Sequence, residues 1–386
     1  MATRRPPNRK ALIRATAGEL FLTRGYHNVS VTDVADALGI TPSALYHHYR
    51  NKQELLFHAV LDALDGVDIL LVQAGSLDQA LAALARLVLG PRSLAVWERE
   101  ARNLEGDQRE QIRAREAEVV GHVVPLLRQE RTELDPADGA LIARAIIGAM
   151  GSRAQHRLSL PRPVDEQLMI RLGRNMAHCR LSAAAVAPRP ERRDADLPVG
   201  FRPGRRDVLL TEAVRLFDER GFRSVTMADI GEAVGIVASG VYRHFPGKTD
   251  LLVAAAQQAG ERMRVVVDGA LAAARDPQDA LERLLAAHIS IWIESQHLVG
   301  ILANDADELP EPERRALRRF QNEYIDIWVR TLQAARPGPA DPTELRIIVH
   351  AVHSMVYFVV RDGRSAADAN LATRLQDLGL ALLQDV

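Results

Sequence analysis

The stretch TPSALYHHYRNKQELL at positions 41–56 has a counterpart, VASGVYRHFPGKTDLL, at positions 237–252. Each stretch carries a serine, a tyrosine, a histidine, a lysine and two leucines at the same places. These pairs are Ser43/Ser239, Tyr46/Tyr242, His48/His244, Lys52/Lys248, Leu55/Leu251 and Leu56/Leu252. A helix that only fills a core rarely carries so many polar side chains, so each stretch is expected to present a binding surface.

The similarity extends well beyond the two stretches. Residues 9–60 align with residues 205–256 without a gap, and 18 of these 52 pairs are identical. The offset of 196 is close to half of the chain, which predicts two similar units in tandem. A fainter similarity joins DPADGALIARAIIGAM (135–150) to DPTELRIIVHAVHSMV (341–356), and both segments open with an Asp N-cap followed by a proline.

Composition indicates an ordered intracellular protein. The chain has 386 residues, of which 47% are hydrophobic and 26% charged, enough for two or more packed cores. The single cysteine, Cys179, cannot form an internal disulfide, which fits a reducing cytoplasm. The start, MATRRPPNRK, lacks the apolar run of a secretory signal, and no segment resembles a membrane span. We therefore expect a cytoplasmic protein with no membrane partner.

The fold expected is all-α. Apolar residues recur at helical spacing almost throughout: Leu12, Ile13, Ala17, Leu20 and Phe21 share one face of a first helix, which Gly25 is expected to end as a left-handed cap. A proline-rich, charged segment near the middle predicts an exposed linker. The predicted division is a helix-turn-helix domain at 1–52, a helical regulatory domain at 53–185, a linker at 186–203, a second helix-turn-helix domain at 204–248 and a second helical regulatory domain at 249–386.

Each repeated segment has the layout of a helix-turn-helix. Two short helices are joined through a tight turn at Gly39 in the first copy and Gly235 in the second. The second of these helices fits the major groove of B-DNA and presents its first side chains to base edges. Segments 41–48 and 237–244 are therefore the predicted reading surfaces.

The side chains on these surfaces suit DNA. In the first copy Thr41, Ser43 and His47 are expected to meet bases or phosphates, while Leu45 and Tyr49 point to the core. Tyr46 offers a hydroxyl and Lys52 a positive charge to phosphate oxygens.

In the second copy Ser239, Gly240 and Arg243 take the equivalent places. Arg243 has the side chain that can bind guanine in a bidentate manner.

The arrangement F-x3-G-[YF]-x6-D-[VI]-x4-G-[IV]-x3-[AG]-[LV]-Y-x-H-[YF]-x2-K-x2-LL resembles the TetR family of bacterial transcriptional repressors, over about 50 residues in each half. The resemblance implies two TetR-like units, each with three DNA-binding helices followed by a helical ligand-binding and dimerisation domain. It implies DNA contacts for Ser30, Thr32 and Thr226, while Ala228 stands where the first copy has Thr32. The predicted DNA-binding residues are Arg4, Arg5, Ser30, Thr32, Thr41, Ser43, Ala44, Tyr46, His47, His48 and Lys52, with Thr226, Ser239, Gly240, Tyr242, Arg243, His244 and Lys248.

Charge separates the two copies. Residues 1–52 hold eight basic and three acidic side chains, whereas residues 200–248 hold eight and six. Because neutralisation of phosphates supplies much of the affinity for DNA, the first module is expected to bind more strongly. Arg4 and Arg5 are candidates for a flexible arm in the minor groove.

Candidate effector-binding residues come from the regulatory segments. Trp292, Tyr324, Trp328, His350, His353 and Tyr357 are expected to line one cavity, and Trp97 and His122, with His156, are weaker candidates in the first half. The alternative is that these aromatic and histidine side chains simply pack in cores. His350 and His353 lie three residues apart without an acidic or cysteine partner nearby, so neither a metal nor a cofactor is expected.

The function expected is a DNA-binding transcriptional regulator that a small apolar or amphipathic effector releases from its double-stranded operator. Repression follows only from the resemblance, and an activator of the same fold is the alternative. Helices at 136–157, 341–361, 164–180 and 366–384 are candidates for joining the halves, either as an intramolecular pseudo-dimer or between chains as a homodimer. An adaptor that binds proteins is a further alternative, whereas no catalytic pattern supports an enzyme.

Overall fold

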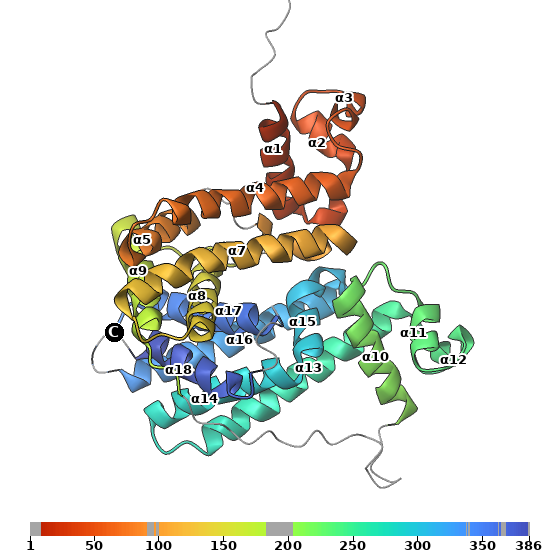
Figure 1. The fold of residues 1–386 in the computed structure, drawn as a ribbon. Helices are drawn as coiled ribbons and strands as arrows, with labels where there is room; N and C mark the ends of the chain where they lie inside the picture. The colour runs from red at the N-terminus through yellow and green to blue at the C-terminus, as the bar shows by residue number, and fades with distance from the viewer. Residues whose placement is uncertain are drawn as a thin grey trace, which may run out of the picture. The chain divides into compact units, whose positions relative to one another are not determined.

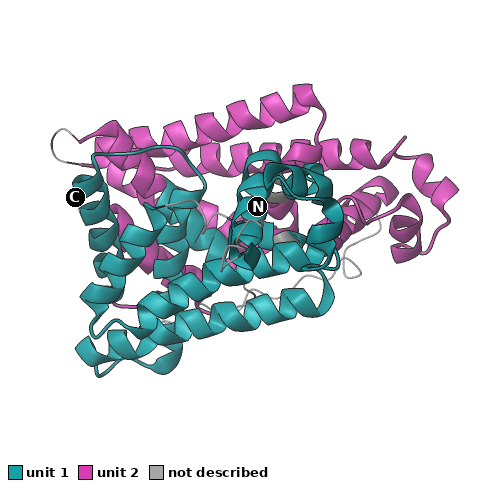
Figure 2. Cartoon of the chain, turned by 90° about the horizontal axis from the view of Figure 1, so that it is seen from above, with its two compact units in different colours: residues 1–179, 350–359, 385 teal, residues 180–349, 360–384, 386 magenta. Residues whose placement is uncertain are grey.

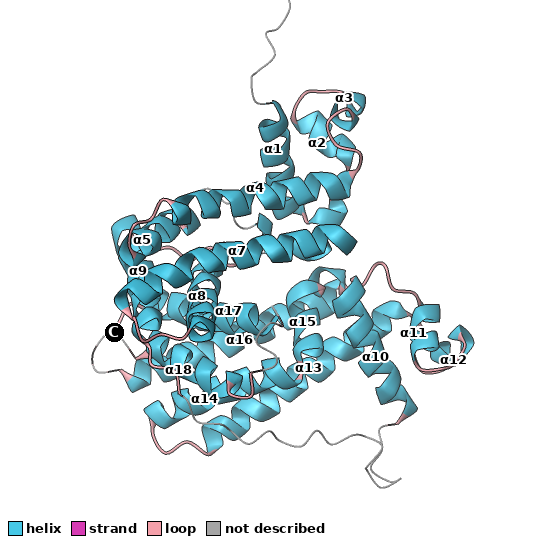
Figure 3. Cartoon of the chain, viewed as in Figure 1, coloured by secondary structure: helices cyan, strands magenta, loops and turns pink. Residues whose placement is uncertain are grey.

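The computed structural model describes residues 9–90, 96–97, 100–182, 204–336, 338, 340–361, 363 and 368–384. Within these ranges the chain forms helices, turns and loops and no strand, which confirms the all-α prediction (Figure 3). The predicted linker at 186–203 and the predicted arm residues Arg4 and Arg5 lie outside the described residues.

The chain divides into two compact units (Figure 2). Unit 1 comprises residues 1–179, 350–359 and 385, and unit 2 comprises the rest. The helices of unit 1 are α1 (Arg9–Arg24), η1 (Tyr26–Asn28), α2 (Val31–Ala37), α3 (Pro42–Tyr46), α4 (Lys52–Val72), α5 (Leu77–Val88), η2 (Ala101–Asn103), α7 (Gly106–Glu130), α8 (Pro136–Gly151), η3 (Ser152–Ala154) and α9 (Arg162–His178).

Unit 2 repeats this order (Figure 1). Its helices are α10 (Arg205–Arg220), α11 (Met227–Ala233), α12 (Ala238–Tyr242), α13 (Lys248–Ala272), α14 (Pro277–Glu294), α15 (Gln296–Asn304), η6 (Ala306–Glu308), α16 (Glu311–Ala335), α17 (Pro342–Arg361) and α18 (Leu371–Leu383). Helix α17 is divided, because its residues 350–359 belong to unit 1. Helices η2 and η6 are both followed by a 25-residue helix, α7 and α16, so the structural repeat continues past the segment where sequence identity fades.

The helix-turn-helix modules, called head 1 (residues 9–52) and head 2 (residues 205–248), owe their shape to matching local signals. Helices α2 and α11 begin with capping boxes, in which Ser30 or Thr226 accepts from the amide of Asp33 or Asp229 and donates its own amide to that carboxylate. These reciprocal bonds satisfy amides that the first turn of a helix leaves without partners.

Both short helices end in a Schellman motif. In head 1 the amide of Ile40 donates to the carbonyl of Ala35 (3.0 Å) and that of Gly39 to the carbonyl of Asp36 (3.0 Å). Head 2 repeats the pair, with Gly235 in the place of Gly39, and both glycines have positive φ angles of 63° and 70°. The glycine turn predicted from sequence is thus confirmed, and it sets the angle at which the reading helix leaves.

The first helix of each head ends differently from the expectation. Gly25 has φ 81° and ψ 142°, and Gly221 has φ 80° and ψ 143°. A left-handed cap needs ψ near 47°, so the predicted cap is wrong in ψ although right in the sign of φ. Both positions still favour glycine, because an L side chain is strained at this φ.

Aromatic pairs fill the core of each head. Phe21 meets Tyr26 edge-on with ring centroids 5.3 Å apart, and the equivalent Phe217 and Phe222 lie 5.1 Å apart. Ile13, Ala17 and Phe21 are buried as expected, but Leu12 is 54% exposed, because it lies at the edge of the apolar face and not at its centre.

The regulatory helices pack closely through glycines. A Cβ at Gly173 of α9 would lie 2.5 Å from Leu81 of α5, and a Cβ at Gly379 of α18 would lie 2.7 Å from Leu285 of α14. In each unit a glycine of the last regulatory helix thus lets that helix approach a leucine closely. At the start of α8 the carboxylate of Asp135 accepts from the amide of Ala137 (2.8 Å), as predicted for an Asp N-cap.

Segment 350–359 of α17 packs on α8 within unit 1. A Cβ at Gly148 would lie 2.7 Å from the Cβ of Phe358, and Gln155 donates to Ser354 Oγ at 3.2 Å. His156, eight residues after Gly148, has its ring 4.6 Å from that of His350, eight residues before Phe358. The two segments therefore run antiparallel, with a glycine at the closest approach.

Helix α17 is the one described helix long and apolar enough to cross a membrane, by length and composition alone. Of its most apolar window, 61% is buried inside the protein, as in the core helix of a packed domain.

Candidate nucleic-acid interface

The reading helices α3 and α12 present most of the predicted side chains to solvent. Thr41, Ser43, Tyr46 and His47 are exposed in head 1, as are Ser239, Tyr242, Arg243 and His244 in head 2. Leu45 and Tyr49 are buried, as predicted. Tyr46 and Tyr242 have equal exposed fractions of 53%, so the two heads hold this ring in equivalent settings.

Three predicted residues are less accessible. Ala44 and His48 are half-buried, and Gly240 is buried, because a Cβ there would lie 3.1 Å from the Cδ1 of Ile236. Gly240 therefore lets α12 pack closely on the turn, and this position offers little surface to a ligand.

Ser30 and Thr226 are exposed, but their hydroxyls already take part in the capping boxes. The hydrogen bond from the Ser30 hydroxyl lowers the pKa of Asp33, and the one from Thr226 lowers the pKa of Asp229. Thr32 and Ala228 are exposed in the first turns of α2 and α11. A phosphate contact is therefore open to Thr32, whereas Ala228 has no polar side-chain atom for it.

Lys52 and Lys248, the lysines of the repeated motif, are anchored within their heads. Lys248 Nζ donates to the carbonyls of Phe222 (2.7 Å), Val225 (2.8 Å) and Arg223 (3.2 Å) and lies 4.5 Å from the Phe222 ring centroid. Desolvation lowers the pKa of Lys248. These bonds tie the start of α13 to the loop before α11.

Lys52 is the counterpart in head 1. Its Nζ lies 4.0 Å from the ring centroid of Tyr26, and burial raises the pKa of that tyrosine to about 12. Each lysine therefore fastens the start of its long connecting helix to the segment between the first and second helices of its head, and both lysines remain partly exposed.

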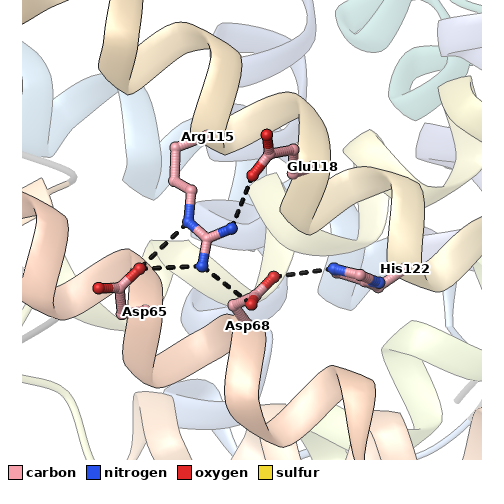
Figure 4. A network of polar contacts seen from close by, with 5 residues as sticks. All are labelled: Asp65, Asp68, Arg115, Glu118 and His122. Carbon is pink, nitrogen blue, oxygen red and sulfur yellow. Dashed lines mark hydrogen bonds and ion pairs between the residues drawn. The ribbon is translucent and has the colours of Figure 1, made fainter.

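A polar network joins the connecting helix α4 to α7 in unit 1 (Figure 4). The guanidinium of Arg115 binds Asp65 (2.9 Å), Asp68 (2.9 Å) and Glu118 (2.6 Å), and His122 Nε2 lies 2.8 Å from Asp68 Oδ1. The hydrogen bond that Arg115 donates to Glu118 is the largest influence that raises the pKa of Arg115. His122, predicted as an effector-binding residue, is thus placed in an ion-pair network.

Unit 2 uses a different interaction at the same place. The alignment of the two heads, continued along α4 and α13, pairs Arg264 with Asp68. The alignment of η2 with η6, continued along α7 and α16, pairs Phe320 with Arg115. The guanidinium of Arg264 lies 5.1 Å from the Phe320 ring centroid. A cation–π contact between α13 and α16 thus replaces the ion pairs between α4 and α7.

Three predicted effector-binding residues gather in the core of unit 2. Tyr324 and Trp328 of α16 and Trp292 of α14 surround His288, whose Nδ1 lies 2.8 Å from the Tyr324 hydroxyl. Burial lowers the pKa of His288 to about 3 and raises the pKa of Tyr324. At neutral pH this ring cluster is therefore uncharged and combines aromatic faces with polar edges.

The other predicted effector-binding residues lie elsewhere. His350, His353 and Tyr357 belong to the segment of α17 that is part of unit 1, so the six candidates do not form one cluster within either unit. Trp97 is buried in unit 1, where its Nε1 donates to Glu116 (2.5 Å) and its ring lies 6.0 Å from that of Phe358.

A charged pair is buried close to His156 and His350 in unit 1, whose rings lie 4.6 Å apart. Arg153 donates to Asp165 (2.7 Å), to the carbonyl of Leu158 (2.8 Å) and contacts His156 Nδ1 (3.1 Å). Only 6% and 4% of the Arg153 and Asp165 side chains are exposed. Burial, with the charges of His350 and Arg153, lowers the pKa of His156 to about 3.

Among the described residues no group of three or more His, Cys, Asp or Glu side chains is arranged to hold a metal ion. Sequence reasoning missed two residues of these sites. His288 lies four residues before Trp292 on the same helix face, a spacing that could have identified it. Val237 stands exposed at the start of α12, where the first head has a capping threonine.

Two exposed reading helices on a helical scaffold define a protein of the helix-turn-helix class. The family model described as bacterial regulatory proteins, tetR family, matches residues 13–59 and 209–255, once in each head. Among curated relatives, the HTH-type transcriptional repressor KstR2 of Mycobacterium tuberculosis is 31% identical over 145 residues, which cover 36% of this chain and 69% of that protein. The chain belongs to the tetR family of bacterial regulatory proteins.

Two further comparisons found similar proteins. KstR2 of Rhodococcus jostii is 29% identical over 141 residues, covering 34% of this chain and 66% of that protein. A solved TetR-family transcriptional regulator from Bordetella parapertussis aligns with a TM-score of 0.43 and 21% identity, covering 45% of this chain and 93% of that one.

Proposed function

We propose that the protein is a ligand-responsive transcriptional repressor that binds one double-stranded operator with two non-identical heads. The observation that carries this proposal is the equal presentation of two reading helices, with Tyr46 and Tyr242 exposed to the same extent above equivalent buried cores. Repression is the activity named for the KstR2 relatives. A reporter gene under the protein's own upstream region should be expressed more strongly after deletion of the protein; lower expression would favour an activator.

One chain is proposed to act as a pseudo-dimer. The sequence repeat pairs α8 with α17, and segment 350–359 of α17 packs antiparallel on α8 at Gly148. A pairing of equivalent helices is the arrangement that a symmetric dimer would form between two chains. Here both helices belong to one chain, so a single chain supplies both heads.

The mass of the complex tests this arrangement. Light scattering after size exclusion, on the protein alone and with a duplex from its own upstream region, should give one chain per duplex. Two chains per duplex would indicate a homodimer with four heads and would overturn the pseudo-dimer.

Salt dependence tests DNA binding itself. Affinity for the duplex should fall steeply as sodium chloride is raised from 50 to 200 mM, because binding releases counterions from neutralised phosphates. An adaptor that binds proteins would show no retention on duplex DNA even at the lower salt concentration.

A small apolar or amphipathic effector is proposed to bind at the ring cluster of unit 2. Tyr324 and Trp328 of α16 correspond to Val119 and Val123 of α7 in unit 1. Because only unit 2 has aromatic rings at these positions, it is the better site for a molecule with an apolar body and a polar edge. An effector that prefers the DNA-free state would shift the population away from the operator complex.

This proposal can be tested with an amphipathic fluorescent probe, 8-anilino-1-naphthalenesulfonate. The probe should quench tryptophan emission, and Tyr324→Phe should weaken its binding without unfolding the chain. Equal binding by both proteins would place the probe elsewhere and contradict this site.

A further inference from the structure

Val237 is an unusual residue for its position. It is the N-cap of α12, and no side-chain hydrogen bond caps that helix. In head 1 the equivalent Thr41 accepts from the amide of Ala44 (3.3 Å). Valine cannot cap a helix in this way, so head 2 forgoes a stabilising interaction that head 1 has.

The Val237 side chain also faces solvent. At 72% it has the largest exposed fraction among the exposed large apolar side chains of the described residues. Single exposed apolar residues are common on protein surfaces, so exposure alone carries no weight. What distinguishes Val237 is its place on the reading surface of head 2, whose other exposed side chains are those of Ser239, Tyr242, Arg243 and His244.

Three of these five positions are the same in both heads, because Ser43, Tyr46 and His48 match Ser239, Tyr242 and His244. The two that differ are Thr41 against Val237 and His47 against Arg243. Any difference in base sequence between the two half-sites is therefore expected to be read at these two positions. Of the two residues in head 2, only Val237 is apolar.

We propose that Val237 contacts the C5 methyl group of a thymine in the half-site bound by head 2, and so selects that base. This inference rests on the proposed DNA-binding function. In the major groove only thymine presents a methyl group, and an apolar side chain at the first positions of a reading helix is placed to meet it. Valine offers two methyl groups to this contact, whereas Thr41 offers one and its hydroxyl is engaged with the amide of Ala44.

The test replaces single thymines by deoxyuridine, which lacks only the C5 methyl group, in a duplex that footprinting has reduced to the two half-sites. One replacement in the half-site of head 2 should weaken binding of the wild-type protein about fourfold, the factor expected for burial of one methyl group. Val237→Ser should bind the thymine and deoxyuridine duplexes equally. Because Val237 is exposed, this variant should fold as the wild type does, which circular dichroism checks.

Two results would overturn the inference: no replacement changes the affinity, or the same replacement weakens wild type and Val237→Ser alike. Thr41→Ser is the matched variant for head 1, and it should leave the effect in the half-site of head 2 unchanged. Loss of that effect in Thr41→Ser would also contradict the assignment to Val237. Failure to bind any duplex would instead refute the proposed function, and this inference with it.

Discussion

The guanidinium carbon of Arg264 lies 5.1 Å from the centroid of the Phe320 ring, on the helix pair of unit 2 that corresponds to α4 and α7 of unit 1. The residue that corresponds to Arg264 is Asp68, which has the opposite charge and binds Arg115. Both contacts fasten the helix that leaves the head to a long helix of the regulatory part. The two heads are thus attached to their regulatory helices by chemically different interactions.

We expect this difference to appear as a difference in salt sensitivity. Arg115→Gln should lower the free energy of unfolding by about 1 kcal/mol at low salt, and the loss should shrink in 1 M sodium chloride because partly exposed ion pairs are screened. Arg264→Gln should cost about 0.5–1 kcal/mol at both salt concentrations, since its cation–π contact is short-ranged. Denaturant unfolding at the two salt concentrations measures both values; equal salt dependence in the two variants would contradict the assignment.

Lys52 and Lys248 should differ in their effects on DNA binding. Lys52→Gln is expected to weaken binding to the operator more than Lys248→Gln, because head 1 carries the larger excess of basic residues. It should also reduce the slope of log affinity against log salt by about 1. Fluorescence anisotropy over a salt series checks this ranking, and equal losses in the two variants would refute it.

Lys248 should also matter for stability. Lys248 Nζ donates three hydrogen bonds to carbonyls of the preceding loop. Lys248→Gln should therefore cost about 1.5–3 kcal/mol of unfolding free energy, the range for losing hydrogen bonds to a charged group. Denaturant titration measures this loss, and an unchanged free energy of unfolding would contradict the anchoring role of Lys248.

Gly148 should be intolerant of a single methyl group. Gly148→Ala places a Cβ 2.7 Å from the Cβ of Phe358 and should destabilise the fold by about 1–3 kcal/mol, as overpacking of a core does. Gly66→Ala in α4 is the matched control: nothing lies within 4 Å of its added Cβ, so the better helix propensity should stabilise by about 0.5–1 kcal/mol. If both variants were stabilised, the close approach of segment 350–359 to α8 would be disproved.

Acid should destabilise the protein through its buried histidines. The pKa values of His156 and His288 are lowered from 6.5 to about 3 in the folded state. Between pH 6.5 and 3 the unfolded chain binds protons that the folded chain does not, so stability is complete above pH 6.5 and falls as the pH drops through this window.

The size of this effect can be measured one histidine at a time. His288→Gln should flatten the plot of unfolding free energy against pH by up to about 1.4 kcal/mol per pH unit, the value for one proton. His47→Gln, which changes an exposed ring, serves as the control. An unchanged slope in His288→Gln would show that this histidine is not kept neutral by burial.

Much of each head could be predicted because its signals are local. Ser30 with Asp33, and Thr226 with Asp229, form capping boxes at the starts of α2 and α11, and Gly39 and Gly235 turn the chain where predicted. Such features depend on residues within one or two turns of each other, so a sequence pattern contains nearly all the information. The positions of Leu45 and Tyr49 in the core follow from the same helical spacing.

The regulatory part was less predictable because its contacts join residues far apart in the chain. Nothing near His350 in the sequence indicates that its ring contacts that of His156, and nothing near His122 indicates its contact with Asp68. The grouping of Trp292, Tyr324 and Trp328 was predicted, but their central partner, His288, was not. Helical spacing shows which side chains share a face, whereas the partner of that face is decided by tertiary packing.

The two reading surfaces, residues 41–48 and 237–244, are encoded by separate stretches of one gene. In a regulator assembled from two identical chains, one mutation alters both surfaces at once, and the operator must then change in two places before the fit is restored. With two separately encoded heads, a substitution such as one at Val237 alters one reading surface and leaves Thr41 and its neighbours unchanged. Regulator and operator can therefore diverge one half-site at a time, while the other head still matches its own half-site.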